Sequence, residues 1–256
     1  MSEIYNSRPL DVESGLPPRR RARRDGEPPT RARRRFLAIH HALRERITLL
    51  RYPPGTRLDI VALSREFGVS RTPIRAVLQR LEYDGLVMTR HGVGTRVTEV
   101  DLGRLREVTE FRMRLAELIG ELSPLPPSPA CLERFERALD ACRALGEQLD
   151  AEGFARVDLE VHACVCSLIG HPQLLEDYDE LYYRTARMWF ALLPRLPWAD
   201  EVARFRADVE LQLLALRRGD VRGVGFLVRN ALSGVLYRVL GLVEPEPDAG
   251  AAATPG

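Results

Sequence analysis

Asp158 and His162 are the two side chains whose types and spacing best suit metal or ligand chemistry in this sequence. They lie four residues apart in an apolar helical pattern, so both fall on one helix face and could share an ion. Glu160 lies between them and points away from that face, and no nucleophile converges on the pair. We therefore expect a binding site here, and we do not expect the chain to be an enzyme.

A second group of side chains suits DNA. Arg71 and Arg75 lie one turn apart near the start of a predicted helix, where a guanidinium can pair with guanine O6 and N7 and add about 1 to 3 kcal/mol of discrimination. Ser70 and Thr72 place hydroxyls beside the same helix N-terminus, which favours phosphate oxygens. These four residues predict a recognition helix. Gln79 and Glu82 continue the same exposed face.

The elements that must position these side chains follow from the hydrophobic spacing. Helices are predicted at about residues 36–51, 59–67 and 71–83. Asp59 is the expected N-cap of the second helix, and Gly68 ends it. Residues 86–100 alternate around a glycine-containing turn, which predicts a β-hairpin with His91 and Gly92 at its tip. Three helices and a hairpin in this order predict a winged helix-turn-helix, which presents its third helix to the major groove.

Charge divides the chain into two parts. Residues 1–100 hold 20 arginines against 11 acidic residues, a balance of +9, and residues 101–256 hold 18 against 25, a balance of −7. A basic front half suits DNA, which would repel the acidic back half. We predict a disordered basic arm at 1–33, the winged helix-turn-helix at 34–100, an all-α effector-binding and dimerisation domain at 101–243 and a disordered tail at 244–256.

The second domain is predicted to be an all-α bundle of six or seven helices, with one break at the proline-rich residues 122–129. Bundle cores are a common place for a ligand cavity. We expect no membrane span and no secretory signal, because no stretch of eighteen apolar residues is present. A cytoplasmic location is the resulting expectation. Buried core thiols are expected at Cys131, Cys142, Cys164 and Cys166.

The first domain resembles the GntR family of bacterial regulators. The matching segments are Pro53-Pro-Gly-Thr-Arg-Leu58, Leu63-Ser-Arg-Glu-Phe-Gly-Val-Ser-Arg-Thr-Pro-Ile-Arg75, Leu78-Gln-Arg-Leu81 and Asp84-Gly-Leu86. The resemblance implies a homodimer that binds double-stranded DNA at a short palindromic operator. The family's DNA-contacting positions carry over onto Ser70, Arg71, Thr72, Arg75, His91 and Gly92.

The second domain resembles the FadR-like effector domain of that family, the FCD type. The matching segments are Val108 to Leu115, Asp158-Leu-Glu-Val-His162, Ile169-Gly-His-Pro172 and Leu216-Arg-Arg-Gly-Asp220. The resemblance implies a divalent metal held by one Asp and three His, of which Asp158 and His162 match two. The other two positions are Val209 and Ala231, and Asn230 lies one residue, or about 100° of helix, out of register. With two ligands absent, we expect no metal cofactor at this site.

Two other interpretations of this region stay open. One is a metal-free pocket in which Asp158 and His162 form a hydrogen-bonded pair and Arg112 recognises an acidic group. The other is a buried polar pair with no ligand. A lost metal site would also permit a larger apolar cavity, lined by Val209, Trp189 and Phe226. The candidate pocket residues are Arg112, Asp158, His162, Val209 and Asn230.

The predicted function is that of a sequence-specific, DNA-binding transcription regulator that responds to a small-molecule effector and acts as a homodimer. The effector domain would change the spacing of two recognition helices, which requires a coupling free energy of about 1 to 3 kcal/mol. The alternative is an effector-independent DNA binder whose helical domain only dimerises. The sequence identifies neither the effector nor the operator.

Overall fold

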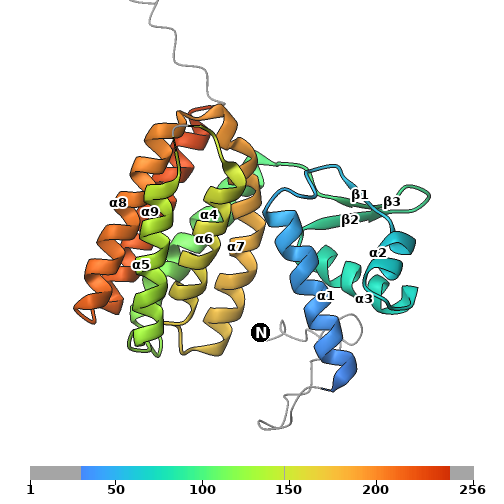
Figure 1. The fold of residues 1–256 in the computed structure, drawn as a ribbon, viewed down its shortest axis with the longest axis horizontal. Helices are drawn as coiled ribbons and strands as arrows, with labels where there is room; N and C mark the ends of the chain where they lie inside the picture. Colours follow the sequence, from blue (N-terminus) through green and yellow to red (C-terminus); the bar gives the residue numbers. More distant parts are fainter. Residues whose placement is uncertain (1–29, 147, 243–256) are drawn as a thin grey trace, which may run out of the picture.

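The computed structural model describes residues 30–146 and 148–242. Most of the predicted arm at 1–33 and all of the tail predicted at 244–256 lie outside the described residues. Two bodies stand side by side in Figure 1, a small domain with three helices and a sheet, and a larger bundle of helices. A short stretch after the last strand leads from the first body into the second.

The first body has the element order of a winged helix-turn-helix. Its elements are α1 (Arg31–Thr48), β1 (Arg57–Leu58), α2 (Ile60–Glu66), α3 (Arg71–Tyr83), β2 (Val87–Arg90) and β3 (Gly94–Val97). The Asp59 side chain accepts hydrogen bonds from the main-chain nitrogens of Val61 and Ala62, at 2.7 and 3.4 Å, and so caps α2 as predicted. Gly68 has a φ of +61°, which allows the tight turn into α3.

The structure differs from the sequence prediction at two places in this domain. Helix α1 begins at Arg31, inside the predicted arm, because Thr30 Oγ1 accepts a hydrogen bond from the Arg33 nitrogen and caps the helix there. The predicted hairpin is present as β2 and β3, but β1 pairs with β3 as a third antiparallel strand, so the sheet has the order β1-β3-β2 and Leu58 pairs with Thr95. With only two residues, β1 is too short to give an alternating pattern.

One hydrophobic core holds the DNA-binding domain together. The apolar faces of α1 and α3 meet in it, with Ile47 and Leu81 fully buried, and Val87 and Val97 pack from the sheet. Fully burying a leucine or isoleucine side chain contributes about 1.5 to 3 kcal/mol. This packing fixes which face of α3 is left outside.

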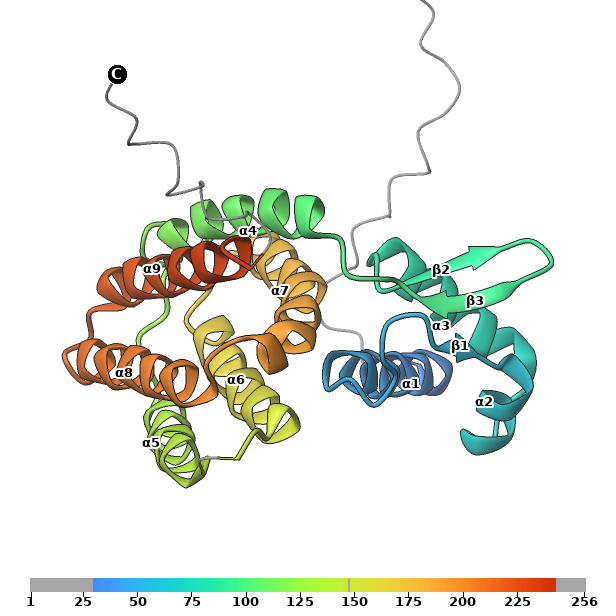
Figure 2. The same cartoon turned by 90° about the horizontal axis from the view of Figure 1, so that it is seen from above.

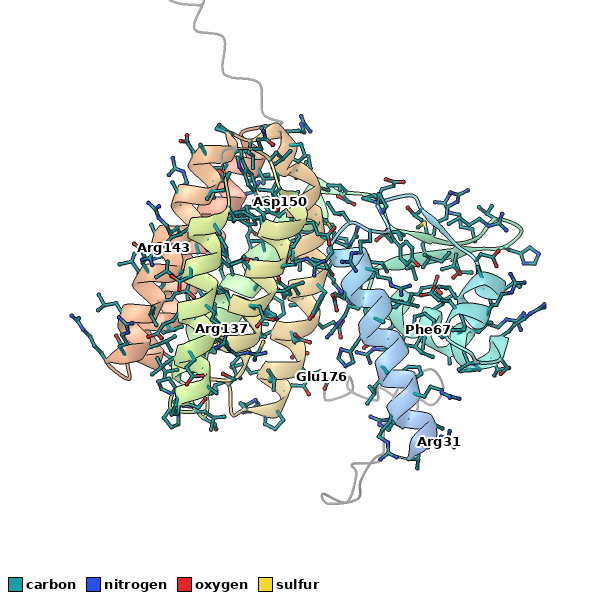
Figure 3. All side chains as sticks on the ribbon, viewed as in Figure 1. Arg31, Phe67, Arg137, Arg143, Asp150 and Glu176 are labelled. Atoms are coloured by element: carbon teal, nitrogen blue, oxygen red, sulfur yellow. The ribbon has the colours of Figure 1, made fainter. Side chains whose placement is uncertain are left out.

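The second body is an all-α bundle, as predicted. Its six described α-helices are α4 (Leu102–Glu117), α5 (Pro129–Ala144), α6 (Ala151–Cys166), α7 (Pro172–Leu192), α8 (Trp198–Arg217) and α9 (Val221–Leu240). Short 3-10 turns, η1 (Leu118–Gly120) and η2 (Leu193–Arg195), follow α4 and α7. Side chains fill the space between the helices (Figure 3). No helix in the described part of the chain is long and apolar enough to cross a bilayer.

Helices α4 and α9 lie side by side along one face of the bundle, and α5, α6 and α8 lie behind them (Figure 2). Helix α7 occupies the edge of the bundle nearest the first domain and contacts α1 there. It is therefore the helix through which the two domains touch most directly.

Candidate nucleic-acid interface and ligand cavity

Helix α3 exposes two arginines opposite its buried face. Ile74 and Val77 are fully buried in the core, whereas the side chains of Arg71 and Arg75 are exposed. Within the described residues neither arginine forms an ion pair or a hydrogen bond. Two guanidinium groups one turn apart, free of partners and held on a rigid helix, can reach phosphates or the edges of guanine bases.

The N-terminus of α3 is open to an anion. Ser70 occupies the N-cap position, but its hydroxyl makes no capping hydrogen bond, and both Ser70 and Thr72 are exposed. The main-chain N–H groups of the first turn have no partner inside a helix and carry partial positive charge. The site thus offers two hydroxyls and free main-chain donors, which is a suitable arrangement for a phosphate group.

The hairpin tip lies at the end of the wing. His91 and Gly92 are both exposed there, and Gly92 has a φ of +76°, a backbone conformation that favours glycine. Glu82 is not free to read DNA, because it accepts a hydrogen bond from the Thr89 nitrogen at 2.7 Å. That bond ties α3 to β2, so Glu82 positions the wing relative to the recognition helix.

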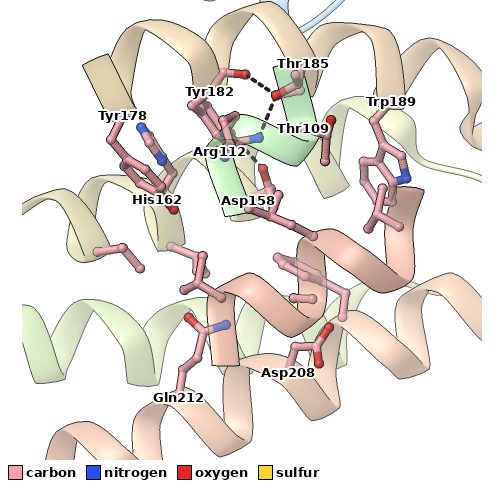
Figure 4. A pocket seen from close by; sticks show the side chains of 18 of the residues that line it. Thr109, Arg112, Asp158, His162, Tyr178, Tyr182, Thr185, Trp189, Asp208 and Gln212 are labelled. Atoms are coloured by element: carbon pink, nitrogen blue, oxygen red, sulfur yellow. Dashed lines mark hydrogen bonds between the residues drawn. The ribbon is translucent and has the colours of Figure 1, made fainter. Parts of the chain in front are cut away.

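The helical domain encloses a cavity of about 130 Å³. Arg112 of α4, Asp158 and His162 of α6 and several residues of α7 lie around it, while Gln212 and Asp208 of α8 lie across from them (Figure 4). Three of the five predicted pocket residues therefore meet at one cavity. Burial raises the pKa of Asp208 above its ordinary value, so this carboxyl accepts a proton more readily than an exposed one.

Arg112 is a buried cation with no carboxylate of the described chain at ion-pair distance, although the charge of Asp158 in the same cavity interacts with it. Its guanidinium donates to Thr185 Oγ1 at 2.6 Å and lies about 5 to 6 Å from the ring centres of Tyr178 and Tyr182. Among the described residues it forms no ion pair with a carboxylate, and its Nε has no hydrogen-bond partner. An unpaired buried charge is costly, so this geometry favours an acidic group from a ligand.

Two further polar atoms beside the cavity lack partners. Trp189 Nε1 and Gln212 Oε1 are buried and make no hydrogen bond to any described residue. Both residues line the cavity, as Trp189 was expected to do. Buried polar groups without partners are rare in native proteins unless a ligand or water completes them. The cavity therefore offers one donor and one acceptor in addition to Arg112.

Asp158 and His162 do not form the expected hydrogen-bonded pair. Asp158 Oδ2 accepts a hydrogen bond from the Tyr182 hydroxyl at 2.7 Å, and His162 Nε2 lies 3.0 Å from Oδ1 of Asp179 on α7. Burial raises the pKa of Asp158 to about 6 and lowers the pKa of His162 to about 4. His162 is therefore neutral near pH 7, with its ring stacked on Tyr182 at 3.6 Å between centres.

The other two predicted pocket residues do not line the cavity. Val209 is fully buried in the bundle core, and Asn230 is exposed and bonded to Arg229. Phe226, also considered for the cavity wall, does not line the cavity and is 42% exposed. Spacing alone did not predict which faces of α8 and α9 meet the cavity. Asp208 and Gln212 of α8 and Ala231 of α9 line it, in place of Val209 and Asn230.

The residues around the cavity do not fit the metal that the family resemblance implies. Ala231 lines the cavity but has no donor atom, and Val209 has none either. Asp158 is already engaged by Tyr182. A lone carboxylate and a histidine that faces another partner do not make the four-ligand set.

Sequence reasoning missed the contribution of α7. Tyr178, Tyr182 and Thr185 line the cavity from one side of this helix, and their spacing of four and three residues was the available signal. In the sequence alone this spacing cannot be distinguished from that of an ordinary buried helix face.

The opposite side of α7 faces the DNA-binding domain with charged side chains. Arg184 donates to the main-chain oxygen of Asp84, which follows α3, and Arg187 donates to the main-chain oxygen of Thr98 at 2.8 Å. Glu180 forms ion pairs with Arg184 on its own helix and, at 3.4 Å, with Arg80 of α3. Asp179 pairs with Arg44 of α1 at 3.0 Å. The joint between the domains is thus polar and built largely from arginines.

A winged helix-turn-helix with free arginines, joined to a helical domain with an internal cavity, defines a DNA-binding transcription regulator with an effector domain. Residues 37–97 match the family model described as "Bacterial regulatory proteins, gntR family", and residues 107–233 match the FCD domain model. The chain belongs to the GntR family of transcription regulators and carries an FCD effector domain.

Curated relatives agree with this assignment. A fatty acid metabolism regulator protein of Escherichia fergusonii is 30% identical over 158 residues, which cover 55% of this chain and 66% of the relative. An uncharacterized HTH-type transcriptional regulator in the TAR-I ttuE-ttuC' intergenic region of Agrobacterium vitis is 28% identical over 131 residues, covering 50% of this chain and 77% of the relative. These relatives are transcription regulators and not enzymes, in agreement with the prediction.

Solved structures share the fold. A putative GntR transcriptional regulator from Rhodococcus sp. RHA1 superposes with a TM-score of 0.65 and 21% identity, covering 82% of this chain and all of that chain. E. coli McbR/YncC gives a TM-score of 0.55 at 21% identity, covering 81% and 96%. At this identity the similarity establishes the architecture of both domains together and nothing finer.

Proposed function

We propose that this chain is a ligand-responsive, dimeric regulator in which a small organic acid in the FCD cavity changes the affinity of α3 and the wing for operator DNA. The observation that carries the proposal is Arg112, a buried guanidinium beside a cavity with no carboxylate of the described chain paired to it. A regulator that needed no effector would gain nothing from such a group, whereas an acidic ligand would neutralise it.

The DNA-binding part of the proposal rests on α3 and the wing. Arg71 and Arg75 supply base and phosphate contacts, Ser70 and Thr72 supply phosphate contacts at the helix N-terminus, and the wing tip approaches the adjacent backbone. Because a dimer presents two copies of α3, the proposed operator is a short palindrome whose half-sites lie about one helical turn, roughly 34 Å, apart. DNA is in the cytoplasm of a bacterium, so this is the proposed location.

The cavity favours a small acid that also carries a hydroxyl or amino group. Arg112 and Thr185 can bind the carboxylate, and Gln212 and Asp208 on the other side of the cavity can accept hydrogen bonds from a hydroxyl or amine (Figure 4). Its volume of about 130 Å³ is well below the roughly 300–1,000 Å³ of pockets for drug-sized ligands. Relatives named fatty acid metabolism regulators make long acyl ligands the alternative, which this volume disfavours.

Helix α7 is the proposed route from ligand to DNA. Tyr182 and Thr185 contact the cavity from one side of the helix, and Arg184 contacts the end of α3 from the other. A ligand that displaces α7 by repacking against these side chains moves the groups that hold α3. The change in DNA affinity can be no larger than the ratio of the ligand's affinities for the two positions of α7.

The proposed dimer uses the outer face of α4 and α9. Phe111 is 55% exposed on α4 and Tyr237 is 82% exposed on α9, and the two helices lie side by side. A groove beside Phe111 is lined by residues of α4 and by Arg229 of α9. With both features on one face, two copies related by a two-fold axis could each place this aromatic side chain against the groove of the other.

A thermal-shift screen tests the effector part of the proposal. We expect hydroxy or amino carboxylic acids to stabilise the protein, by about 2.7 kcal/mol at a hundred times the Kd, and their amides not to do so. Arg112→Met should lose this response, and Arg218→Ala, an exposed arginine of the same domain, should keep it. A hit must also change DNA affinity. If no acid stabilises the wild type, the effector-independent DNA binder is the better interpretation, and stabilisation by long acyl compounds alone would reject a small acid.

A further inference from the structure

His162, Cys166 and Asp179 gather three kinds of metal-binding atom at one point. Nε2 of His162 lies 3.0 Å from Oδ1 of Asp179 and 3.3 Å from the sulfur of Cys166, and the three ligand atoms all lie within 4.8 Å of one another. His162 and Cys166 are separated by one turn of α6, and Asp179 faces them from α7. Two rigid helices therefore hold the cluster.

We propose that these three side chains bind one divalent cation of the zinc type. Tetrahedral zinc has Zn–N and Zn–O bonds of about 2.0 to 2.2 Å and Zn–S bonds of about 2.3 Å, which place the ligand atoms roughly 3.3 to 3.8 Å apart. The two distances from His162 Nε2, 3.0 Å to Asp179 and 3.3 Å to Cys166, are near the lower end of that range, and all three atoms lie within 4.8 Å of one another. A mixed set of imidazole, thiolate and carboxylate is typical of zinc and unlike the all-oxygen sets of calcium or magnesium.

The protonation states are compatible with binding. Burial lowers the pKa of His162, so its imidazole is neutral. In the tautomer with the proton on Nδ1, its Nε2 has a free lone pair for the cation. Burial opposes ionisation of Asp179, but the hydrogen bond to His162 and the charge of Arg44 outweigh it and lower the pKa of Asp179. Burial raises the pKa of Cys166, so its thiol releases a proton to solvent as the sulfur binds the cation. One thiolate and one carboxylate then balance the two positive charges.

A second, smaller cavity reaches one member of the cluster, Asp179, and could hold a water as a fourth ligand on that side. It measures about 90 Å³, and Asp179 and Arg44 line it together with Glu176 and Glu180. Figure 3 places Glu176 on the side of α7 towards α1. Four acidic side chains and two arginines, Arg44 and Arg80, line this cavity, so its balance of charge is negative, and a water can complete the coordination, as zinc sites with three protein ligands often require.

The site lies at the joint between the two domains. Oδ1 of Asp179 faces His162, while Oδ2 accepts the hydrogen bond from Arg44 of α1 at 3.0 Å. A cation on Oδ1 would leave Oδ2 to Arg44, so Arg44 would orient the ligating carboxylate. This set shares only His162 with the Asp and three His implied by the family resemblance, and it needs neither Val209 nor Ala231.

Cobalt binding to the EDTA-treated, reduced protein tests the site. We expect one equivalent of Co²⁺ to bind with a near-ultraviolet thiolate-to-cobalt band and to be displaced by Zn²⁺. Cys166→Ser should abolish the band, and Cys166→Ser and Asp179→Asn should each lower the affinity at least tenfold. Circular dichroism and thermal unfolding must show that both variants are folded.

Two control variants distinguish this site from other possibilities. Asp158→Asn removes the carboxylate that the family-type site would use, and Cys142→Ser removes a buried thiol on α5 outside the cluster. Both should keep the band and the affinity. Loss of binding in Asp158→Asn with retention in Cys166→Ser would overturn the proposal, as would failure of the wild type to bind Co²⁺.

An X-ray absorption spectrum of the zinc-loaded wild type needs no variant. We expect one sulfur at about 2.3 Å together with nitrogen and oxygen ligands at about 2.0 to 2.2 Å. A spectrum with nitrogen and oxygen ligands alone would contradict the proposal even if the cysteine variant failed to fold. Neither measurement depends on an effector or on DNA, so its outcome is independent of the proposed function.

Discussion

Arg184 of α7 donates from Nε to the main-chain oxygen of Asp84 at 2.7 Å, and from Nη2 to the main-chain oxygen of Tyr83 at 3.1 Å. Tyr83 is the last residue of α3 and Asp84 follows it. The C-terminal end of the predicted recognition helix is therefore hydrogen-bonded to the helix that forms one wall of the cavity. A positively charged donor at the last carbonyls of a helix also interacts favourably with the helix dipole.

Arg184→Ala should loosen the end of α3 from the bundle. It removes two charge-assisted hydrogen bonds, each contributing about 1.5 to 3 kcal/mol in a protected setting and less where solvent reaches them. Hydrogen-exchange mass spectrometry should show faster exchange at residues 83–87. Arg195→Ala, which removes an exposed arginine at the end of η2, the turn after α7, should leave exchange there unchanged. Equal exchange in the two variants would mean that Arg184 does not hold the domains together.

Arg75→Ala should reduce operator binding more than binding to random DNA. The operator can be obtained by sequencing the fragments that the purified protein retains from a random library. Loss of one bidentate guanine contact predicts about 1 to 3 kcal/mol, or roughly 5- to 150-fold, on the operator. The control is Arg218→Ala, on the helical domain. Equal losses on operator and random DNA would show that Arg75 contacts phosphate only.

Phe111→Glu and Tyr237→Glu should weaken the proposed dimer. Burying roughly 100 Å² of apolar surface contributes about 2.5 kcal/mol, and each substitution occurs twice in a two-fold interface. Analytical ultracentrifugation should therefore show at least a hundredfold rise in the dimer dissociation constant. Leu214→Glu is the matched control, because Leu214 is also apolar and 46% exposed but lies on α8. A dimer that survives both aromatic substitutions would place the interface elsewhere.

Local signals in the sequence predicted the DNA-binding domain well. The Asp59 cap, the positive φ of Gly68 and the buried stripe of α3 all depend on residues close together in the chain, so spacing is enough to infer them. Strand β1 was missed because its two residues are defined by pairing with β3, about forty residues away. The start of α1 was misplaced because arginine-rich composition suggested disorder and Thr30 supplied a cap.

The cavity was predicted only in part. The residue spacing within one helix shows which side chains share a face, but it does not show which side chains of another helix they contact. Arg112, Asp158 and His162 do line it, but the hydrogen-bond partners of the last two, Tyr182 and Asp179, come from α7. Their rotation relative to α6 depends on the packing of the whole bundle. Cys166 is a neighbour of His162 on the same helix, so its spacing of four residues was an available signal that the sequence analysis did not use.

Asp158 should make the protein more stable as the pH falls from 7.5 to 5. Burial raises its pKa to about 6 in the folded protein, against an ordinary value of 3.8, so the folded state binds the proton more tightly than the unfolded state does. The contribution is therefore fully present below pH 3.8 and is lost as the pH rises through 6. Between pH 7.5 and 5 these values correspond to a gain of about 1.4 kcal/mol in the free energy of unfolding.

Asp158→Asn isolates this contribution, because the amide does not titrate and its oxygen can still accept the hydrogen bond from Tyr182. Urea unfolding of both proteins at a series of pH values, with EDTA present, measures the difference. The wild type should gain about 1.4 kcal/mol relative to the variant on acidification to pH 5, while other titrating groups cancel. A constant difference across this range would mean that the cavity keeps Asp158 solvated, so that burial does not raise its pKa above the ordinary value of 3.8.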